Sequence, residues 1–259
     1  MTIYRLAVLG DPVERSKSPI LHEAMLGLAG LEGTYVRIRA DRDVLSQTVE
    51  ELRRGEWHGL NVTMPLKEAA AELSDDLGPR TELSRSVNTL LADGGRVAGY
   101  STDTTAFRAL LESDRFADAG SILLIGAGGS AAAAMAAIDG ERPVYVGARR
   151  RERAERLTAT FGGEVVRWGA AVAGSLVINT TPLGMNGENL PGEILSACRG
   201  LIDLPYGGAP TPAIRSAARL EIPHADGQEF LVRQAVESFR LWTGANIDHL
   251  ELLSAVRNV

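Results

Sequence analysis

Lysine is almost absent from this chain. Among its 27 basic residues only Lys17 and Lys67 are lysines, and all the others are arginines. Arginine keeps its proton near neutral pH, whereas a partly buried lysine can release one, so the two lysines are candidates for proton chemistry. Lys67 is the last residue of the motif Asn61-Val62-Thr63-Met64-Pro65-Leu66-Lys67. Its polar neighbours favour a functional role for Lys67 over that of a surface charge. For Lys17 a solvated surface charge stays an open alternative.

Other absences exclude several classes of protein. Cys198 is the only cysteine, so no internal disulfide can form and a cytoplasmic location is expected. The four histidines lack metal-ligand spacing, so no metal site is expected. No apolar run approaches the roughly 20 residues that span a bilayer. A net charge of −6 argues against binding to nucleic acid or to a membrane surface. An anionic small-molecule substrate would need local positive charge and amide donors to offset that field.

Strand-like and helix-like segments alternate along the chain, which predicts an α/β fold with mainly parallel strands. Pro65 can open one helix, and Asp103 can cap another. The predicted strands are 3–9, 34–39, 59–62, 87–92, 96–100, 121–125, 143–147, 164–168, 176–179 and 201–204. The predicted helices include 20–29, 44–54, 103–111, 229–243 and 249–256.

A second strand system begins at Ser121, after a polar stretch around residues 113–120, so a domain boundary is placed near residue 104. The terminal helices are expected to return to the first domain. We therefore predict an α/β substrate-binding domain of residues 1–104 plus 228–259, and a Rossmann-type dinucleotide-binding domain of residues 105–227. Apolar spacing in the terminal helices suits either the core or a dimer, so monomer and homodimer both stay open.

A glycine-rich turn marks the dinucleotide site. Ile125-Gly126-Ala127-Gly128-Gly129-Ser130-Ala131 follows an apolar strand and opens an alanine-rich helix. Glycine permits a tight turn and close backbone approach, and the helix N-terminus offers amides to a pyrophosphate. The next strand ends in Ala148-Arg149-Arg150-Arg151, without an acidic residue before Glu152. Arginines at this point favour the 2′-phosphate of NADP over NAD.

Short polar motifs follow several predicted strands, at Ser16/Ser18, Asn61/Thr63/Lys67, Asn88 and Asp103. Taken singly, each residue is more often a local cap than a ligand. At the carboxyl ends of strands, however, such side chains converge on one crevice. Hydroxyls and amides in that crevice would suit a small polyol.

The ordered set of motifs resembles the shikimate dehydrogenase family over essentially the whole chain. The motifs are Gly10-Asp11-Pro12-Val13, Ser16-Lys17-Ser18-Pro19 with His22, Asn61 to Lys67, Val87-Asn88-Thr89, Thr102-Asp103, the glycine turn, Asn179 to Met185, Asp203-Leu204-Pro205-Tyr206, and Gly227 through Gln234-Ala235.

The resemblance implies a role for each matching residue. Lys67 and Asp103 would be the catalytic pair, and Ser16 and Ser18 would hold a substrate carboxylate. The other substrate contacts would be Asn61, Thr63, Asn88, Tyr206 and Gln234. The NADP contacts would be Gly126, Ala127, Gly128, Gly129, Ser130, Ala131, Arg149, Arg150, Thr181, Met185 and Gly227.

Four positions depart from the family pattern: Ser101 for Asn, Ala106 for Gly, Ala148-Arg149-Arg150 for Asn-Arg-Thr, and Phe230 for Met. None removes a group of the implied catalytic pair. The implied reaction is the NADP-dependent reduction of 3-dehydroshikimate to shikimate in aromatic amino acid biosynthesis. The alternatives are a quinate or aminoshikimate dehydrogenase, a folate-cycle dehydrogenase of similar build, and a non-catalytic NADP-binding sensor.

Overall fold

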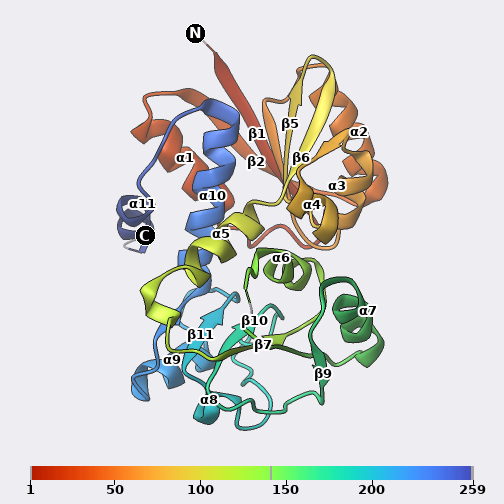
Figure 1. Ribbon diagram of the computed structural model, residues 1–259. Coiled ribbons are helices and arrows are strands. Elements are labelled where there is room, and N and C mark those ends of the chain that lie inside the picture. Colours follow the sequence, from red (N-terminus) through yellow and green to blue (C-terminus); the bar gives the residue numbers. More distant parts are fainter. Residues whose placement is uncertain (1, 141, 258–259) are drawn as a thin grey trace. The chain divides into compact units, whose positions relative to one another are not determined.

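Residues 2–140 and 142–257 are described by a computed structural model, and the chain divides into two units (Figure 1). The first unit comprises residues 1–105 and 231–259, and the second comprises residues 106–230. Both boundaries fall inside helices, α5 (Thr102–Leu111) and α10 (Gly227–Thr243), which contribute residues to both units. No helix in the described part of the chain has the length and apolarity needed to cross a membrane.

A six-stranded mixed sheet in the order β2-β1-β3-β5-β6-β4 forms the centre of the first unit. Strand β1 pairs in parallel with β2 and β3, whereas β5 pairs antiparallel with β3 and β6. Because β1 and β3 run in parallel, their polar carboxyl-terminal motifs lie at one edge of the sheet. The strands are β1 (Ile3–Gly10), β2 (Glu32–Arg39), β3 (Gly59–Val62), β4 (Asp76–Leu77), β5 (Thr89–Asp93) and β6 (Arg96–Tyr100).

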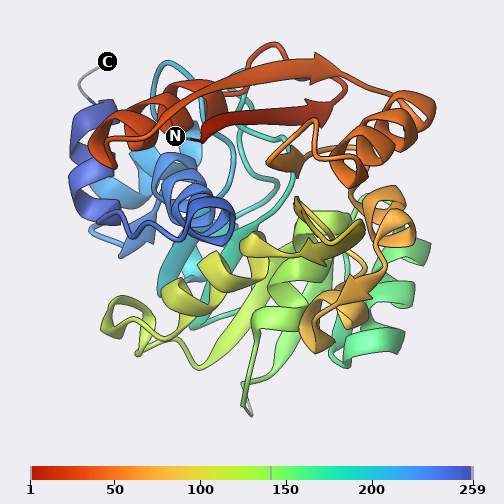
Figure 2. The same ribbon diagram turned by 90° about the horizontal axis from the view of Figure 1, so that it is seen from above.

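Helices cover both faces of this sheet. Apolar residues of α1 (Ser18–Leu28), α10 and α11 (His249–Arg257) form one cluster, and these helices lie side by side in both views (Figures 1 and 2). Helices α2 (Arg42–Arg53) and α3 (Lys67–Leu73) pack against the strands in another cluster. The return of the terminal helices α10 and α11 to the first unit thus has a physical cause in their shared apolar core with α1.

Several local expectations for the first unit were wrong. Helix α2 begins at Arg42 because the Asp41 side chain accepts hydrogen bonds from the amides of Asp43 (3.1 Å) and Val44 (3.0 Å). Helix α3 begins at Lys67, so Pro65 precedes the helix and does not open it. Strand β4 and helix α4 (Pro79–Ser84) were not predicted, because both are too short to show a hydrophobic period.

The second unit contains six parallel strands in the order β12-β11-β10-β7-β8-β9. Counted along the chain this is the 3-2-1-4-5-6 order of a Rossmann fold, which confirms the predicted fold class. The central strands β7 and β10 are buried along their full length. The strands are β7 (Ser121–Ile125), β8 (Val144–Gly147), β9 (Glu164–Val166), β10 (Ser175–Asn179), β11 (Gly200–Asp203) and β12 (His224–Ala225).

Helices α6 (Gly129–Ala137) and α7 (Arg151–Phe161) pack on one face of the second sheet, and α8 (Ile194–Ala197) and α9 (Pro212–Arg219) on the other. Helix α9 was not predicted, although its N-terminus carries a recognisable cap: Thr211 Oγ1 accepts from the amide of Ile214 (3.1 Å), and Pro212 follows the cap. The short helix α8 and a 3₁₀ turn at Asp114–Phe116 were also missed.

A tight glycine contact fixes α10 on the first sheet. A Cβ atom at Gly59 in β3 would overlap the indole of Trp242, whose Nε1 donates to the carbonyl of Leu90 (3.0 Å). We expect Gly59→Ala to lower the free energy of unfolding by about 1–3 kcal/mol, the usual cost of overpacking a core. Urea denaturation followed by tryptophan fluorescence measures it.

The matched control is Gly27→Ala in α1, where an added Cβ would meet no atom within 4 Å. Alanine favours a helix over glycine by about 0.5–1 kcal/mol, so this variant should be as stable as the wild type or more stable. Equal effects of the two substitutions would contradict the packing argument.

Candidate functional site

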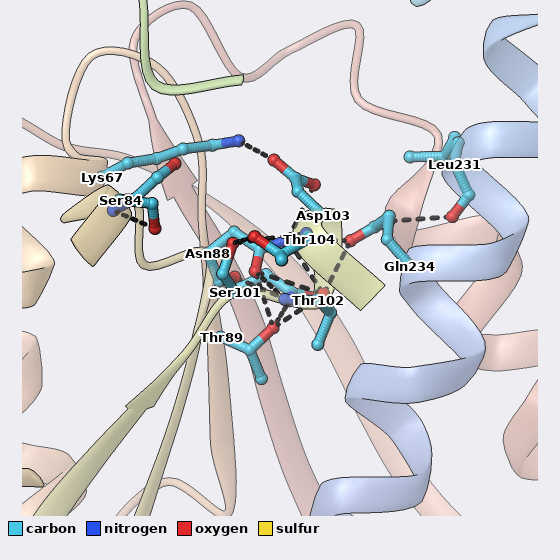
Figure 3. A network of polar contacts seen from close by, with 12 residues as sticks. Lys67, Ser84, Asn88, Thr89, Ser101, Thr102, Asp103, Thr104, Leu231 and Gln234 are labelled. Carbon is cyan, nitrogen blue, oxygen red and sulfur yellow. Dashed lines mark hydrogen bonds and ion pairs between the residues drawn. The ribbon is translucent and has the colours of Figure 1, made fainter. Parts of the chain in front are cut away.

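A buried ion pair joins the two residues predicted to be catalytic. Lys67 is the first residue of α3, and its Nζ contacts Oδ2 of Asp103, near the start of α5 (Figure 3). The side chains are only 13% and 6% exposed. Charges this poorly hydrated persist only when paired and hydrogen-bonded. An ammonium has three N–H donors, so Lys67 can pair with Asp103 and still donate to another oxygen.

Asn88 fixes the orientation of Asp103. The Asn88 Nδ2 donates to Asp103 Oδ1 (3.0 Å), which leaves Oδ2 for Lys67. Its own Oδ1 accepts from the amide of Thr102 (2.8 Å), so one asparagine holds both the side chain and the start of the helix.

Asp103 is not the cap of α5, contrary to our expectation. Ser101 occupies that position, and its Oγ accepts from the amide (3.4 Å) and hydroxyl (2.9 Å) of Thr104. Serine is a good N-cap, so Ser101 frees the Asp103 carboxylate for Lys67 and Asn88.

Residues of helix α10 extend this hydrogen-bond network. Gln234 Oε1 accepts from Asn88 Nδ2 (3.3 Å), and Gln234 Nε2 donates to the carbonyl of Leu231 (2.9 Å) (Figure 3). One turn further along, the hydroxyl of Ser238 lies 2.8 Å from that of Thr89. The structure therefore brings Lys67, Asn88, Asp103 and Gln234 together in the first unit.

Asn61 is hydrogen-bonded through both atoms of its side-chain amide. Its Oδ1 accepts from the hydroxyl of Tyr35 (2.7 Å), and its Nδ2 donates to the carbonyl of Asn88 (2.9 Å) and the hydroxyl of Ser238 (3.1 Å). The residue is 5% exposed. Sequence reasoning did not include Tyr35 or Ser238; for Ser238 the position four residues after Gln234, on the same helix face, was an available indication.

A buried histidine lies against Tyr35. The His22 ring is fully buried and stacks on the Tyr35 ring, with centroids 4.3 Å apart and planes 3° from parallel. Neither ring nitrogen has a hydrogen-bond partner among the described residues. Burial lowers the pKa of His22 to about 3, so the ring is neutral at physiological pH.

Of the two serines predicted to hold a carboxylate, Ser16 lies in the loop between β1 and α1 and Ser18 lies at the start of α1. Ser16 Oγ donates to Ser18 Oγ (3.1 Å) and accepts from the Ser18 amide (3.3 Å). Ser18 is the first residue of α1, and the cap position belongs to Lys17, which forms no side-chain cap, so a capping role for Ser18 was wrong. Thr63, just after β3, is half-buried, and its amide bonds to the carbonyl of Leu9 (2.8 Å).

The glycine turn of the second unit is tight and leads into α6 without a side-chain cap. Gly126 has φ +115°, and a Cβ there would lie 2.5 Å from Thr180 Oγ1. A Cβ at Gly128 would meet no atom within 4 Å, so the space over the turn is open. No side chain caps α6. The first helical hydrogen bond is from Ala132 to Gly128, so the preceding amides, including that of the buried Ala131, are available to an anion.

Two arginines follow strand β8 on the exposed surface. Arg149 and Arg150 form no ion pair with any described residue, whereas Arg151 pairs with Glu155 (2.8 Å). Arg150 is the residue before α7, and its side chain caps no amide. Two uncompensated guanidinium groups at this strand end fit a phosphate ester.

Hydrogen bonds also shape the loop after β10. Asn179 Oδ1 accepts from the amide (3.0 Å) and hydroxyl (2.7 Å) of Thr181, and its Nδ2 donates to Asp203 (2.7 Å). Burial raises the pKa of Asp203. The Glu188 carboxylate accepts from amides on either side of Met185, whose side chain is exposed. Backbone and side-chain amides lower the pKa of Glu188 to about 2.

Tyr206 and Gly227 both lie in the second unit. Tyr206 is half-buried in the segment after β11. A Cβ on Gly227 would lie 2.6 Å from the carbonyl oxygen of Pro205, so only glycine permits the backbone approach at the start of α10. Ligand contacts of both residues stay predictions.

Comparison with known proteins identifies the family of the chain. The sequence model described as the shikimate dehydrogenase substrate binding domain matches residues 8–90. A shikimate dehydrogenase (NADP(+)) of Alkalilimnicola ehrlichii is 36% identical over 266 residues, 98% of each chain. One of Exiguobacterium sibiricum is 34% identical over 249 residues, 94% of each chain. The crystal structure of shikimate 5-dehydrogenase from Thermus thermophilus in complex with NADP(H) and shikimate has a TM-score of 0.89 at 32% identity, covering 99% of each chain.

This chain belongs to the shikimate dehydrogenase family. Two of its departures from the family pattern are explained by packing in the second unit. The Phe230 ring lies 4.5 Å from that of Phe107, centroid to centroid, and both rings are buried in one core cluster with Ala106. The larger side chain at 230 and the methyl group at 106 thus fill the core of that unit.

Acid should destabilise the shikimate dehydrogenase fold through His22. The pKa of this group is 6.5 in the unfolded chain and about 3 in the folded one, so below pH 6.5 the unfolded state takes up a proton first. Stability that is present above pH 6.5 is therefore lost as the pH falls towards 3. Between pH 7 and pH 5 we expect a loss of about 2 kcal/mol from this group.

Urea midpoints of the wild type and of His22→Phe across that range measure the loss. The variant should lack this part of the pH dependence. Parallel pH profiles for the two proteins would contradict the prediction.

Proposed function

We propose that this protein is an NADP-dependent shikimate dehydrogenase that reversibly reduces 3-dehydroshikimate to shikimate, in the cytoplasm, for aromatic amino acid biosynthesis. The observation that carries the proposal is the buried Lys67–Asp103 pair, held by Asn88. A protonated lysine at a shielded position is the group that ketone reduction needs, because negative charge develops on the carbonyl oxygen. Family membership supports the substrate and the cofactor.

In this mechanism bound NADPH supplies the hydride, and the protein supplies orientation and proton transfer. Lys67 Nζ donates a hydrogen bond to the ketone oxygen, stabilises the charge that grows there and passes it a proton. Asp103 directs Lys67, and Asn88 prevents Asp103 from rotating away. In the direction of shikimate oxidation the neutral Lys67 amine accepts the hydroxyl proton.

We assign substrate binding and catalysis to residues 1–104 plus 228–259. In this assignment the hydroxyl of Ser16, which donates to Ser18 Oγ in the structure, turns to the substrate carboxylate, and the hydroxyl of Ser18 donates to it as well. The remaining substrate contacts are assigned to Asn61, Thr63, Asn88 and Gln234 of this domain, and to Tyr206, which belongs to the second unit.

We assign NADP binding to residues 105–227. The open turn at Gly126 to Ala131 suits the pyrophosphate, and Arg149 with Arg150 suits the 2′-phosphate. Thr181, Met185 and Gly227 are assigned to the nicotinamide side.

Initial rates with shikimate or quinate, each with NADP+ or NAD+, test the proposal through the absorbance of the reduced nicotinamide. Activity confined to shikimate with NADP+ would support the full assignment. Preference for quinate would keep the dehydrogenase and overturn the substrate. Silence in every combination, with NADP+ still bound in calorimetry, would instead favour an aminoshikimate dehydrogenase or a non-catalytic NADP-binding sensor.

Removing the lysine tests the proton donor. We expect Lys67→Ala to lower kcat by about 10²–10⁴-fold with a smaller effect on KM, because the proton moves in the transition state. Lys67→Arg should not restore activity, since arginine keeps its protons. Glu68→Ala, at the next and exposed position of α3, is the control and should keep wild-type kinetics. A fall in kcat of less than about tenfold for Lys67→Ala would exclude Lys67 as the acid.

The arginines test cofactor choice. Charge-assisted hydrogen bonds to a phosphate contribute about tenfold or more each, so the double variant Arg149→Ala/Arg150→Ala should raise the Kd for NADP+ by about 100-fold. The Kd for NAD+, which lacks the 2′-phosphate, should stay unchanged. Arg153→Ala on the exposed face of α7 is the matched control. Calorimetric titration measures both constants, and equal weakening of both cofactors would contradict the assignment.

A further inference from the structure

Side chains on one face of strand β2 contact Asn61 and the loop of Ser16, two of the positions assigned to substrate binding. Tyr35, Arg37 and Arg39 alternate along this edge strand, so their side chains leave the same face. The Tyr35 hydroxyl donates to Asn61 Oδ1 (2.7 Å), and Arg39 pairs with Asp11 (3.0 Å) at the end of β1. Arg37 lies between them and contacts the loop that carries Ser16.

Arg37 donates two hydrogen bonds to the carbonyl oxygen of Ser16. Its Nε lies 3.0 Å and its Nη2 2.6 Å from the oxygen of Ser16. The amide of Ser16 donates to the carbonyl of Val13 (3.0 Å), so both backbone polar groups of Ser16 are held. Its Oγ is in turn bonded to the amide and hydroxyl of Ser18. A chain of contacts therefore runs from the Arg37 guanidinium to both serine hydroxyls.

The charge of Arg37 is not neutralised nearby. Arg39 has Asp11 as its ion-pair partner, whereas Arg37 forms no ion pair with any residue in the described ranges. A guanidinium bound to a carbonyl keeps its full charge. In a chain of net charge −6, this charge beside Ser16 offsets the field that would repel an anionic substrate.

We propose that Arg37 is a positioning residue for recognition of the substrate carboxylate. Through the Ser16 carbonyl it fixes the hydroxyls of Ser16 and Ser18, and it adds the positive charge that these neutral donors lack. The inference rests on the proposed function, in which the two serines hold that carboxylate.

Steady-state kinetics with shikimate and with its methyl ester test the proposal, because the ester keeps the ring but lacks the negative charge. For Arg37→Gln we expect KM for shikimate to rise about tenfold while kcat changes by about twofold or less. The charged donor that holds the Ser16 carbonyl is lost, and this loss weakens substrate binding without affecting the proton transfer. KM for the ester should change by about twofold or less. Arg37→Lys, which keeps the charge but not the paired donors, should fall between Arg37→Gln and the wild type.

The matched control is Arg96→Gln. Arg96 is an exposed arginine on β6, near the opposite edge of the same sheet, and pairs with Asp76 (3.0 Å). The Arg96→Gln substitution changes the net charge by the same amount as Arg37→Gln and leaves the loop of Ser16 untouched. Exposed ion pairs contribute little to stability, so the kinetics of this variant should match those of the wild type. An unchanged KM in Arg37→Gln, an equal rise for acid and ester, or a fall in kcat alone would each overturn the proposal.

Hydrogen exchange separates this inference from the proposed function. The Ser18 amide is bonded to Ser16 Oγ, so its exchange should accelerate in Arg37→Gln and not in Arg96→Gln. If the wild type fails to oxidise shikimate, the proposed function falls, and the exchange rates still decide whether Arg37 holds the loop. Equal exchange in the wild type and Arg37→Gln would overturn the positioning role.

Discussion

The buried pair of Lys67 and Asp103 is the constraint on which the first unit depends. With side chains 13% and 6% exposed, neither charge is well hydrated, and each is stable only while its partner and its hydrogen bonds stay in place. The pair joins the start of α3 to the start of α5, and Asn88 then ties α5 to Gln234 of α10. The ion pair and Asn88 together link three helix segments of this unit.

Neutral groups complete the network around this pair. Asn88 donates to the Asp103 carboxylate without cancelling its charge, and the hydroxyls of Thr102 and Ser238 and the amide of Gln234 bond to Asn88 or to each other. The remaining charge compensation within the network comes from Lys67. Exposed arginine pairs elsewhere, such as Arg96 with Asp76, contribute little by comparison because water screens them.

Local sequence patterns predicted the strands and the glycine turn well, because these depend on apolar runs and on backbone freedom within a few residues. They failed where contacts with residues distant in the sequence determine the hydrogen-bond partners of a side chain. The rule that an aspartate at a helix start is a cap failed at Asp103, because Lys67 and Asn88 compete for its oxygens. The Tyr35 and Ser238 contacts with Asn61 join residues 26 and 177 positions apart, which no local period reveals.

The arrangement of charges also explains why a lysine suits position 67. In the proposed mechanism Lys67 gives its proton to a substrate oxygen, which leaves Asp103 as a buried anion whose remaining partners are neutral. A buried carboxylate without a charged partner costs free energy, so the proposed cycle ends with return of a proton to the amine. An arginine would keep the pair permanently charged and could not take part in this cycle. The lysine at position 67, in a chain whose other basic residues are almost all arginines, is therefore consistent with the proposed proton transfer.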